Sequence, residues 1–186
     1  MRAKTLLPIF VFILILPSLL LTACGTAAST SPSEPATNTP EWFSYKLTDV
    51  RTGETFTMND FAGKVVLVET MAMWCPNCIV QANEVGHLHK LFGNPEDLIS
   101  VSLDISVNED DASLKEYVNN YGFDWYFAVA PLEVARALGN LYSAQYLNPP
   151  LSPMFVIDRN GEVHHLEYGK KSAEMLLENV KPFLTP

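Results

Sequence analysis

The folded part of this chain is predicted to be an α/β domain with a mixed central sheet flanked by helices. Between Glu41 and Pro186, short runs of Val, Ile and Leu alternate with longer segments in which apolar residues recur every three or four positions. The domain closes with two strand-like runs separated by a turn. Strands that alternate with helices and end in a hairpin are typical of a three-layer domain.

The first 23 residues are predicted to be a signal peptide. Arg2 and Lys4 make the start of the chain positive, and an apolar run from Leu6 to Leu21 follows. These features are typical of a secretory signal, and they also suit an uncleaved membrane anchor. In either case we expect the rest of the chain to lie outside the cytoplasm.

Residues 24–40 are predicted to be a flexible linker. After Cys24 they read GTAASTSPSEPATNTP, a composition that cannot bury enough apolar surface to offset its ordering entropy. Residues 41–186 are then one domain, with enough apolar residues for a single core. Without Arg2 and Lys4 the chain has 10 basic and 21 acidic residues, a net charge of −11, which argues against nucleic acid as a partner.

A hairpin, a short helical segment and a buried strand are predicted at the start of the domain. Phe43–Asp49 and Thr55–Thr57 flank the sequence RTGE, in which glycine suits a turn. Met58–Phe61 is predicted to be helical. The continuous apolar run Val65–Val68 is typical of a central strand covered on both faces.

A helix is predicted from Pro76, because proline suits the first turn and apolar residues then recur every three or four positions. Cys75 and Cys78 therefore lie where a strand gives way to a helix. Further strands are expected at Leu98–Leu103, Phe127–Ala130, Met154–Ile157 and Val163–Tyr168, and further helices around Leu114–Tyr121, at about Leu132–Gln145 and at Ser172–Phe183.

The sequence CPNC admits a metal site, a structural disulfide or a redox pair. A structural zinc site needs four ligands, and no second pair accompanies the cysteines. His87 and His89 point apart on a helix, and His164 and His165 lie on opposite faces of a strand. We interpret all four histidines as solvated or hydrogen-bonded surface residues.

Redox chemistry is the interpretation that the position of the pair favours. A disulfide that closes so short a loop adds little stability. A thiolate at a helix N-terminus lies at the positive end of the helix dipole, which lowers its pKa. Cys75 holds this position, and Cys78, one turn further in, is expected to be less exposed and to act as the resolving thiol.

The blocks KVVLVETMAMWCPNC, LISVSLD and LSPMFVIDRNG, in this order, resemble the membrane-anchored, extracytoplasmic thioredoxin-like proteins of the TlpA/ResA type. The resemblance covers nearly all of residues 41–186. It implies a thioredoxin fold with an N-terminal β-hairpin and a central insertion near Asn108–Tyr121. It also implies thiol-disulfide oxidoreductase activity with Cys75 as nucleophile and Cys78 as resolving cysteine, and no cofactor besides their disulfide.

The resemblance also implies a substrate-binding edge. Pro153 matches the cis-proline of the family, which lies against the disulfide and presents the backbone of the preceding residue, Ser152, to the substrate. A cis bond before proline costs only about 0.5 to 1 kcal/mol, so the sequence permits it. Trp74, Pro76 and Ser152 would line the groove.

Glu69 is the candidate proton relay. It follows four apolar residues on a strand expected to be interior, where a carboxylate is costly without a task or a partner. It matches the position of the thioredoxin aspartate that relays a proton to or from the resolving thiol, and burial would raise its pKa. The alternative is a carboxylate at the strand end paired with Lys64.

Leu-Thr-Ala-Cys24 resembles the lipobox of bacterial lipoproteins. The resemblance implies cleavage before Cys24, acyl chains on this residue, and a lipid bilayer as a partner on the extracytoplasmic face of the cell membrane. More than one acyl chain is needed for stable anchoring.

The direction of electron flow is left open by the dipeptide Pro-Asn, which differs from the dipeptides common in the anchored reductases. The resemblance favours reduction of protein disulfides, with cytochrome c maturation as one setting and a membrane thiol protein as electron donor. Two alternatives stay open. A peroxiredoxin-like peroxidase would carry Thr where Ala72 stands, and a metal-binding lipoprotein could use Met71, Met73 and the thiols as soft ligands.

Overall fold

The computed structural model describes residues 39–93 and 96–184. The predicted signal peptide, the lipidation candidate Cys24 and all but the last two residues of the predicted linker lie outside the described residues. Within the described ranges, no helix is both long and apolar enough to cross a membrane.

A five-stranded mixed sheet forms the centre of the domain, in the order β5-β4-β3-β6-β7. β3 pairs in parallel with β4, and β4 with β5, whereas β6 runs antiparallel to both β3 and β7. A separate antiparallel hairpin, β1 with β2, precedes the sheet. The strands are β1 Leu47–Thr48, β2 Thr55–Phe56, β3 Val65–Met71, β4 Leu98–Asp104, β5 Tyr126–Val129, β6 Met154–Ile157 and β7 Val163–His165.

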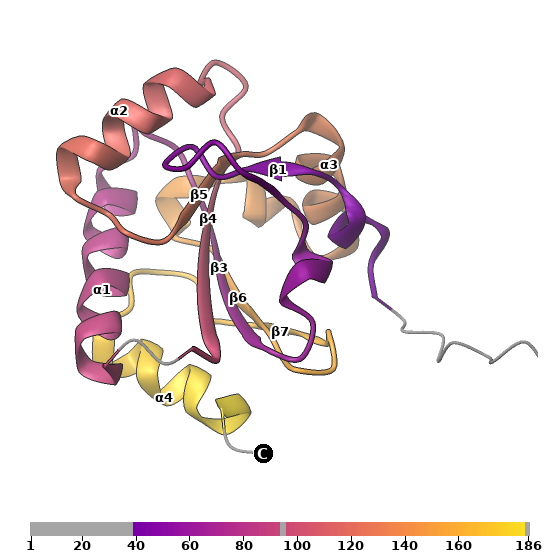
Figure 1. Ribbon diagram of the computed structural model, residues 1–186, viewed down its shortest axis with the longest axis vertical. Helices are drawn as coiled ribbons and strands as arrows, with labels where there is room; N and C mark the ends of the chain where they lie inside the picture. The colour runs from indigo at the N-terminus through magenta and orange to yellow at the C-terminus, as the bar shows by residue number, and fades with distance from the viewer. Residues whose placement is uncertain (1–38, 94–95, 185–186) are drawn as a thin grey trace, which may run out of the picture. The chain divides into compact units, whose positions relative to one another are not determined.

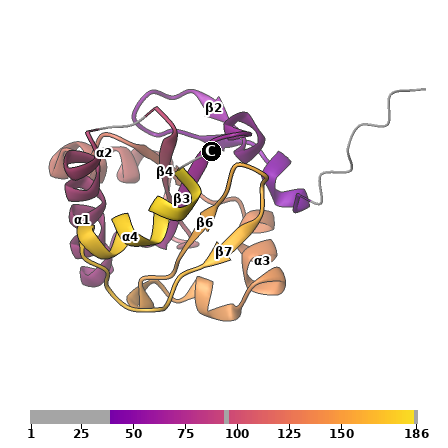
Figure 2. The same ribbon diagram turned by 90° about the horizontal axis from the view of Figure 1, so that it is seen from below.

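Helices cover both faces of this sheet. α1, α2 and α4 lie on one side and α3 on the other (Figures 1 and 2). The α-helices are α1 Pro76–Phe92, α2 Asp111–Tyr121, α3 Leu132–Leu141 and α4 Ala173–Leu184, and the 3-10 helices are η1 Glu41–Ser44, η2 Met58–Phe61, η3 Ala144–Leu147 and η4 Pro149–Leu151.

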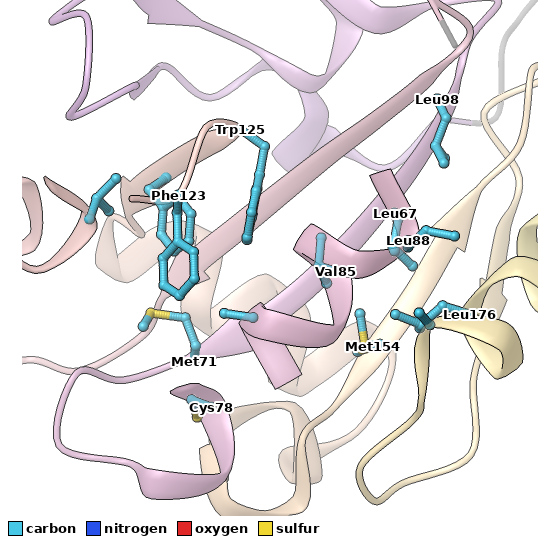
Figure 3. Packing of buried hydrophobic residues seen from close by; sticks show 14 of the residues in the cluster. Leu67, Met71, Cys78, Val85, Leu88, Leu98, Phe123, Trp125, Met154 and Leu176 are labelled. Carbon is cyan, nitrogen blue, oxygen red and sulfur yellow. The ribbon is translucent and has the colours of Figure 1, made fainter. Parts of the chain in front are cut away.

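β3 shows why the domain has two cores. All seven of its residues are buried, and successive side chains point to opposite faces. Val65, Leu67 and Met71 pack with α1, α2 and α4, whereas Val66 and Val68 pack with α3 and the N-terminal hairpin. Figure 3 shows the first core from close by, with Cys78 among its labelled side chains. The cysteine pair therefore closes one end of a packed layer.

The predicted α/β domain, its hairpin and the order of its elements are confirmed, and a central insertion, α2, follows β4. Several boundaries were wrong. The first strand, predicted at Phe43–Asp49, is only Leu47–Thr48, because the 3-10 helix η1 occupies Glu41–Ser44. The helix expected to reach Gln145 ends at Leu141, because Ser143 adopts an extended conformation and its hydroxyl accepts a hydrogen bond from the Gln145 N–H. The last strand ends at His165 and not at Tyr168, because the chain leaves the sheet to pass beside η4, where the Gly169 N–H bonds to the Leu151 carbonyl.

Candidate active site

The two cysteines lie at the junction between β3 and α1, as predicted. Cys75 is the N-cap of α1, and its Sγ accepts a hydrogen bond from the Cys78 N–H at 3.2 Å. Pro76 occupies the first turn, where a missing N–H has no consequence. Cys75 and Cys78 form a disulfide with their Cα atoms 5.3 Å apart. The described structure is therefore the oxidised state of a pair held at the positive end of a helix.

Both cysteines are buried. Cys75 is 0% exposed and Cys78 is 2% exposed. The expectation that Cys75 is the more exposed of the two was wrong for this oxidised state. A distant segment also packs on this junction, and its polar contacts there are to Asn77 and Cys78.

The segment that packs there is η4. The Cys78 Sγ lies 3.6 Å from the carbonyl oxygen of Pro149, and the Asn77 side chain donates a hydrogen bond to the Pro150 carbonyl at 2.8 Å. The Gly169 N–H donates to the Leu151 carbonyl at 2.7 Å from the other side. This 3-10 turn was not predicted from the sequence. Its two consecutive prolines were the available signal, because proline favours the first positions of a helical turn.

The Asn77 contact predicts a measurable change in reactivity. Asn77→Ala removes one hydrogen bond, worth about 1 kcal/mol, from η4. We expect the disulfide of this variant to be reduced several-fold faster by dithiothreitol, measured by alkylation of the released thiols. The control is Asn83→Ala, because the Asn83 side chain donates to the Ile79 carbonyl within α1 and not to η4. Equal rates for Asn77→Ala and the unchanged protein would contradict a covering role for η4.

Ser152 and Pro153 lie directly after η4, where the resemblance places the substrate-binding edge. Ser152 is the only non-glycine residue with positive φ in the described ranges, at 46°, a conformation that costs of order 1 kcal/mol or more. Its N–H donates to the Pro149 carbonyl at 2.8 Å, and the Pro153 carbonyl accepts from the Thr70 N–H of β3 at 3.1 Å. The backbone at Ser152 is therefore fixed from both sides. The cis form of the Ser152–Pro153 bond stays a prediction.

The predicted groove is only partly formed by exposed residues. Trp74 is 60% exposed and Pro76 is also exposed, so both are accessible beside the disulfide. Ser152 is only 3% exposed, and its buried Oγ has no hydrogen-bond partner among the described residues. Ser152 is therefore largely buried in this oxidised state, and its part in substrate binding stays a prediction.

Glu69 is buried in the middle of the sheet, on the face that carries α1. It is 3% exposed, and its Oε1 accepts a hydrogen bond from the Ser102 hydroxyl at 2.7 Å. The Trp125 indole N–H donates to the same hydroxyl at 2.9 Å, which leaves the hydroxyl hydrogen directed at the carboxylate. The proposed pairing with Lys64 was wrong, because the Lys64 ammonium binds the Glu96 carbonyl at 2.7 Å.

Burial raises the pKa of Glu69 to about 7, as expected for a carboxylate removed from water. The hydrogen bond from Ser102 and the charge of Lys171 act in the opposite direction, since both favour the ionised form. A group with this pKa exchanges its proton near neutral pH, which is the range in which a thiol relay operates.

Lys171 is a site residue that sequence reasoning missed. It lies just before α4 and is 4% exposed, and its Nζ donates to the carbonyls of Gly169 at 2.6 Å and Ser152 at 3.3 Å. Burial lowers its pKa to about 8. No local signal distinguished it from its neighbour Lys170, because both belong to one short polar run.

A second acidic group lies beside the loop that leads to Cys75. The Asp104 side chain ends β4 fully buried, and burial together with the neighbouring carboxyl of Glu109 raises its pKa to about 8. Glu109 accepts a hydrogen bond from the Met73 N–H at 3.0 Å. The hydrogen bond to Glu109 thus holds the loop before Trp74. The aspartate that ends LISVSLD was the available signal for it.

The histidines are hydrogen-bonded or exposed, as interpreted from the sequence. His89 bonds to Ser100, and His165 to the Tyr146 hydroxyl. His164 bonds to Asp158 at 3.0 Å, and His87 is exposed. None of these contacts involves the cysteine pair.

Known proteins resemble the chain over most of its length. A profile of the family described as Redoxin matches residues 33–181. The thiol-disulfide oxidoreductase ResA of Geobacillus kaustophilus is 27% identical over 143 residues, 74% of this chain and 75% of that protein. The same-named protein of Halalkalibacterium halodurans is 24% identical over 133 residues, 70% of each. The thiol:disulfide interchange protein of Chlorobium tepidum superposes with a TM-score of 0.58 at 21% identity, covering 76% of this chain and 93% of that one.

Proposed function

The chain belongs to the Redoxin family and is a redox enzyme of the thioredoxin-like type, and we propose that it reduces disulfides of extracytoplasmic proteins through Cys75 and Cys78. The observation that carries this proposal is their disulfide at the N-terminus of α1, in a layer that also buries Glu69.

The reaction begins from the reduced pair. The Cys75 thiolate attacks a substrate disulfide, so that one substrate sulfur leaves as a thiolate and the other is bonded to Cys75. Cys78 then attacks the Cys75 sulfur and releases the second substrate thiolate. Two electrons pass from the pair to the substrate. The carboxylate of Glu69 accepts the proton of the Cys78 thiol in the second step.

The pair must be reduced again before the next cycle, and a membrane thiol protein is the proposed donor. No metal or organic cofactor takes part. The apolar start of the chain and the sequence Leu-Thr-Ala-Cys24 support a lipid anchor at Cys24 on the extracytoplasmic face of the membrane. Cytochrome c maturation is one pathway that needs such a reductant.

A redox titration tests the direction of electron flow. The protein is equilibrated with graded dithiothreitol or glutathione buffers, and the thiols of Cys75 and Cys78 are counted by alkylation. We expect a two-electron transition near or below about −250 mV, the range of reductants such as thioredoxin. A transition between about −120 and −180 mV would instead identify an oxidant or isomerase.

The peroxidase alternative predicts a different result. The position that carries Thr in such enzymes is Ala72 here, and Ala72 is buried in the core below the junction. We expect the reduced protein to consume hydrogen peroxide no faster than a variant in which both Cys75 and Cys78 are serine. Stoichiometric copper or zinc without a reversible redox transition would favour a metal-binding lipoprotein.

A further inference from the structure

One buried cation links two parts of the site. Lys171 is the only buried lysine or arginine within residues 39–93 and 96–184. A buried ammonium group is costly unless its donors are satisfied. Its partners are backbone carbonyls at the substrate-binding edge, and the nearby buried carboxylate of Glu69 supplies opposite charge.

At the edge, Lys171 holds the backbone of Ser152. The Nζ donates to the Ser152 carbonyl at 3.3 Å, and the Ser152 N–H bonds to Pro149 at 2.8 Å. Ser152 has a strained φ of 46°, and within residues 39–93 and 96–184 its own Oγ has no partner that could hold it there. Strained backbone persists only where surrounding contacts fix it. Lys171 is the side chain that supplies such a contact to the carbonyl.

In the interior, the charge of Lys171 favours the ionised form of Glu69, and Glu69 in turn favours the charged form of Lys171. Three other groups interact with Glu69 or Lys171. Ser102 on β4 donates to Glu69, Tyr117 on α2 has its pKa raised by burial and by the charge of Glu69, and Glu167 favours the charged form of Lys171. Within this set, Lys171 is the one cation that acts on Glu69.

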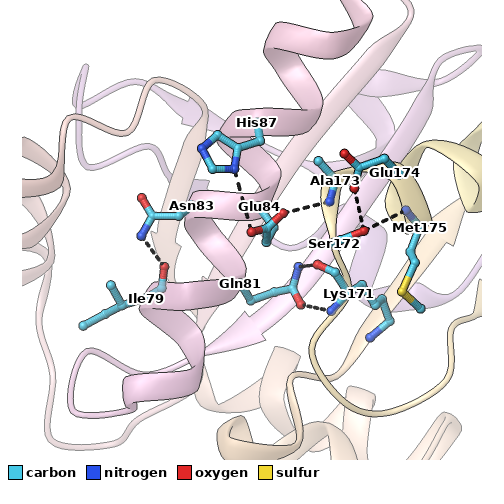
Figure 4. A network of polar contacts seen from close by, with 10 residues as sticks. All are labelled: Ile79, Gln81, Asn83, Glu84, His87, Lys171, Ser172, Ala173, Glu174 and Met175. Atoms are coloured by element: carbon cyan, nitrogen blue, oxygen red, sulfur yellow. Dashed lines mark hydrogen bonds and ion pairs between the residues drawn. The ribbon is translucent and has the colours of Figure 1, made fainter.

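The place of Lys171 in the fold does not depend on its ammonium group. The Gln81 side chain of α1 makes two hydrogen bonds to the Lys171 backbone, at 2.8 and 3.1 Å (Figure 4). The next turn is held in the same way, because Glu84 accepts from the Ala173 N–H at 2.8 Å. A neutral side chain at position 171 therefore keeps these bonds.

We propose that Lys171 is a positioning residue for disulfide exchange: its ammonium group holds the Ser152 carbonyl at the substrate-binding edge, and its charge favours the ionised form of Glu69. This inference rests on the proposed function, and it adds that one side chain couples substrate docking to the charge of the proton acceptor. Loss of this group affects docking and proton transfer together.

Lys171→Met tests the proposal, because methionine is unbranched and uncharged. Turnover of a protein disulfide is measured against pH with the full chain and a chemical dithiol as donor. We expect KM to rise about five- to tenfold, since a hydrogen bond from a charged group is lost. We expect the pH midpoint of kcat to rise by about one unit, since the opposite charge near Glu69 is gone. Lys171→Arg is expected to restore most of the pH midpoint.

Lys170→Met is the matched control, because Lys170 is exposed and carries the same charge one residue away. We expect it to change neither KM nor the pH midpoint. A Lys171→Met protein that equals Lys170→Met in both quantities would overturn the proposal.

A second readout does not depend on activity. The carboxyl of Glu69 is titrated by ¹³C NMR in glutamate-labelled protein, with Glu69→Gln to assign the signal. The proposal expects a higher midpoint in Lys171→Met than in Lys170→Met, and equal midpoints would refute it. If the unchanged protein shows no turnover of protein disulfides, the proposed function fails, while this titration still decides whether Lys171 controls Glu69.

Discussion

Serine in place of Cys78 is expected to stop turnover and to leave the protein covalently joined to its substrate. Cys75 can still attack a substrate disulfide, but no thiol remains to resolve the mixed disulfide. Turnover should fall to the uncatalysed background. The complex is detected on a non-reducing gel and by mass spectrometry, as a product that dithiothreitol releases.

Cys75→Ser is the partner experiment, because it removes the proposed nucleophile. Serine is a favourable N-cap, so we expect α1 to keep its first turn. This variant should neither turn over nor accumulate the complex. A complex formed by Cys75→Ser and not by Cys78→Ser would reverse the assigned roles. The double variant measures any background from Cys24.

Local patterns were sufficient to predict the elements that carry the cysteines. Val65–Val68 is apolar throughout because both faces of β3 are covered, and the period from Pro76 onward follows the buried face of α1. The burial of Glu69 also followed from its place in an apolar run. The burial and the periodicity of these segments depend on residues that are close together in the sequence, so one sequence is enough to predict them.

The errors concern contacts between distant segments. η4, more than 70 residues later in the chain, packs on the junction through contacts to Asn77 and Cys78. Lys171 acts on Glu69 across about 100 residues. Neither contact leaves a periodic pattern, since each depends on how two loops meet after the sheet has formed. For the same reason the sequence suggested Lys64, the nearest cation along the chain, as partner for Glu69.

Buried ionisable groups also set the pH dependence of stability, and Glu69 is the one whose effect is easiest to isolate. Its pKa rises from 4.5 to about 7 on folding, so the folded protein keeps a proton that the unfolded chain releases. The stability that this proton contributes is complete below about pH 4.5 and is lost as the pH rises through about 7. The shift corresponds to roughly 3 kcal/mol.

Glu69→Gln is therefore expected to remove this loss. Glutamine keeps an oxygen that can accept the Ser102 hydroxyl but does not ionise, so the free energy of unfolding of the oxidised variant should fall less between pH 5 and pH 7.5 than that of the unchanged protein. The difference over this pH range should be roughly 2.4 kcal/mol in urea unfolding. Asp104 adds a similar dependence to both proteins, which cancels in the comparison. Glu116→Gln, an exposed change on α2, should follow the unchanged protein. Parallel curves for Glu69→Gln and the unchanged protein would mean that Glu69 is already ionised in the folded state well below pH 7, and that its carboxylate is too weak a base to accept the Cys78 proton near neutral pH.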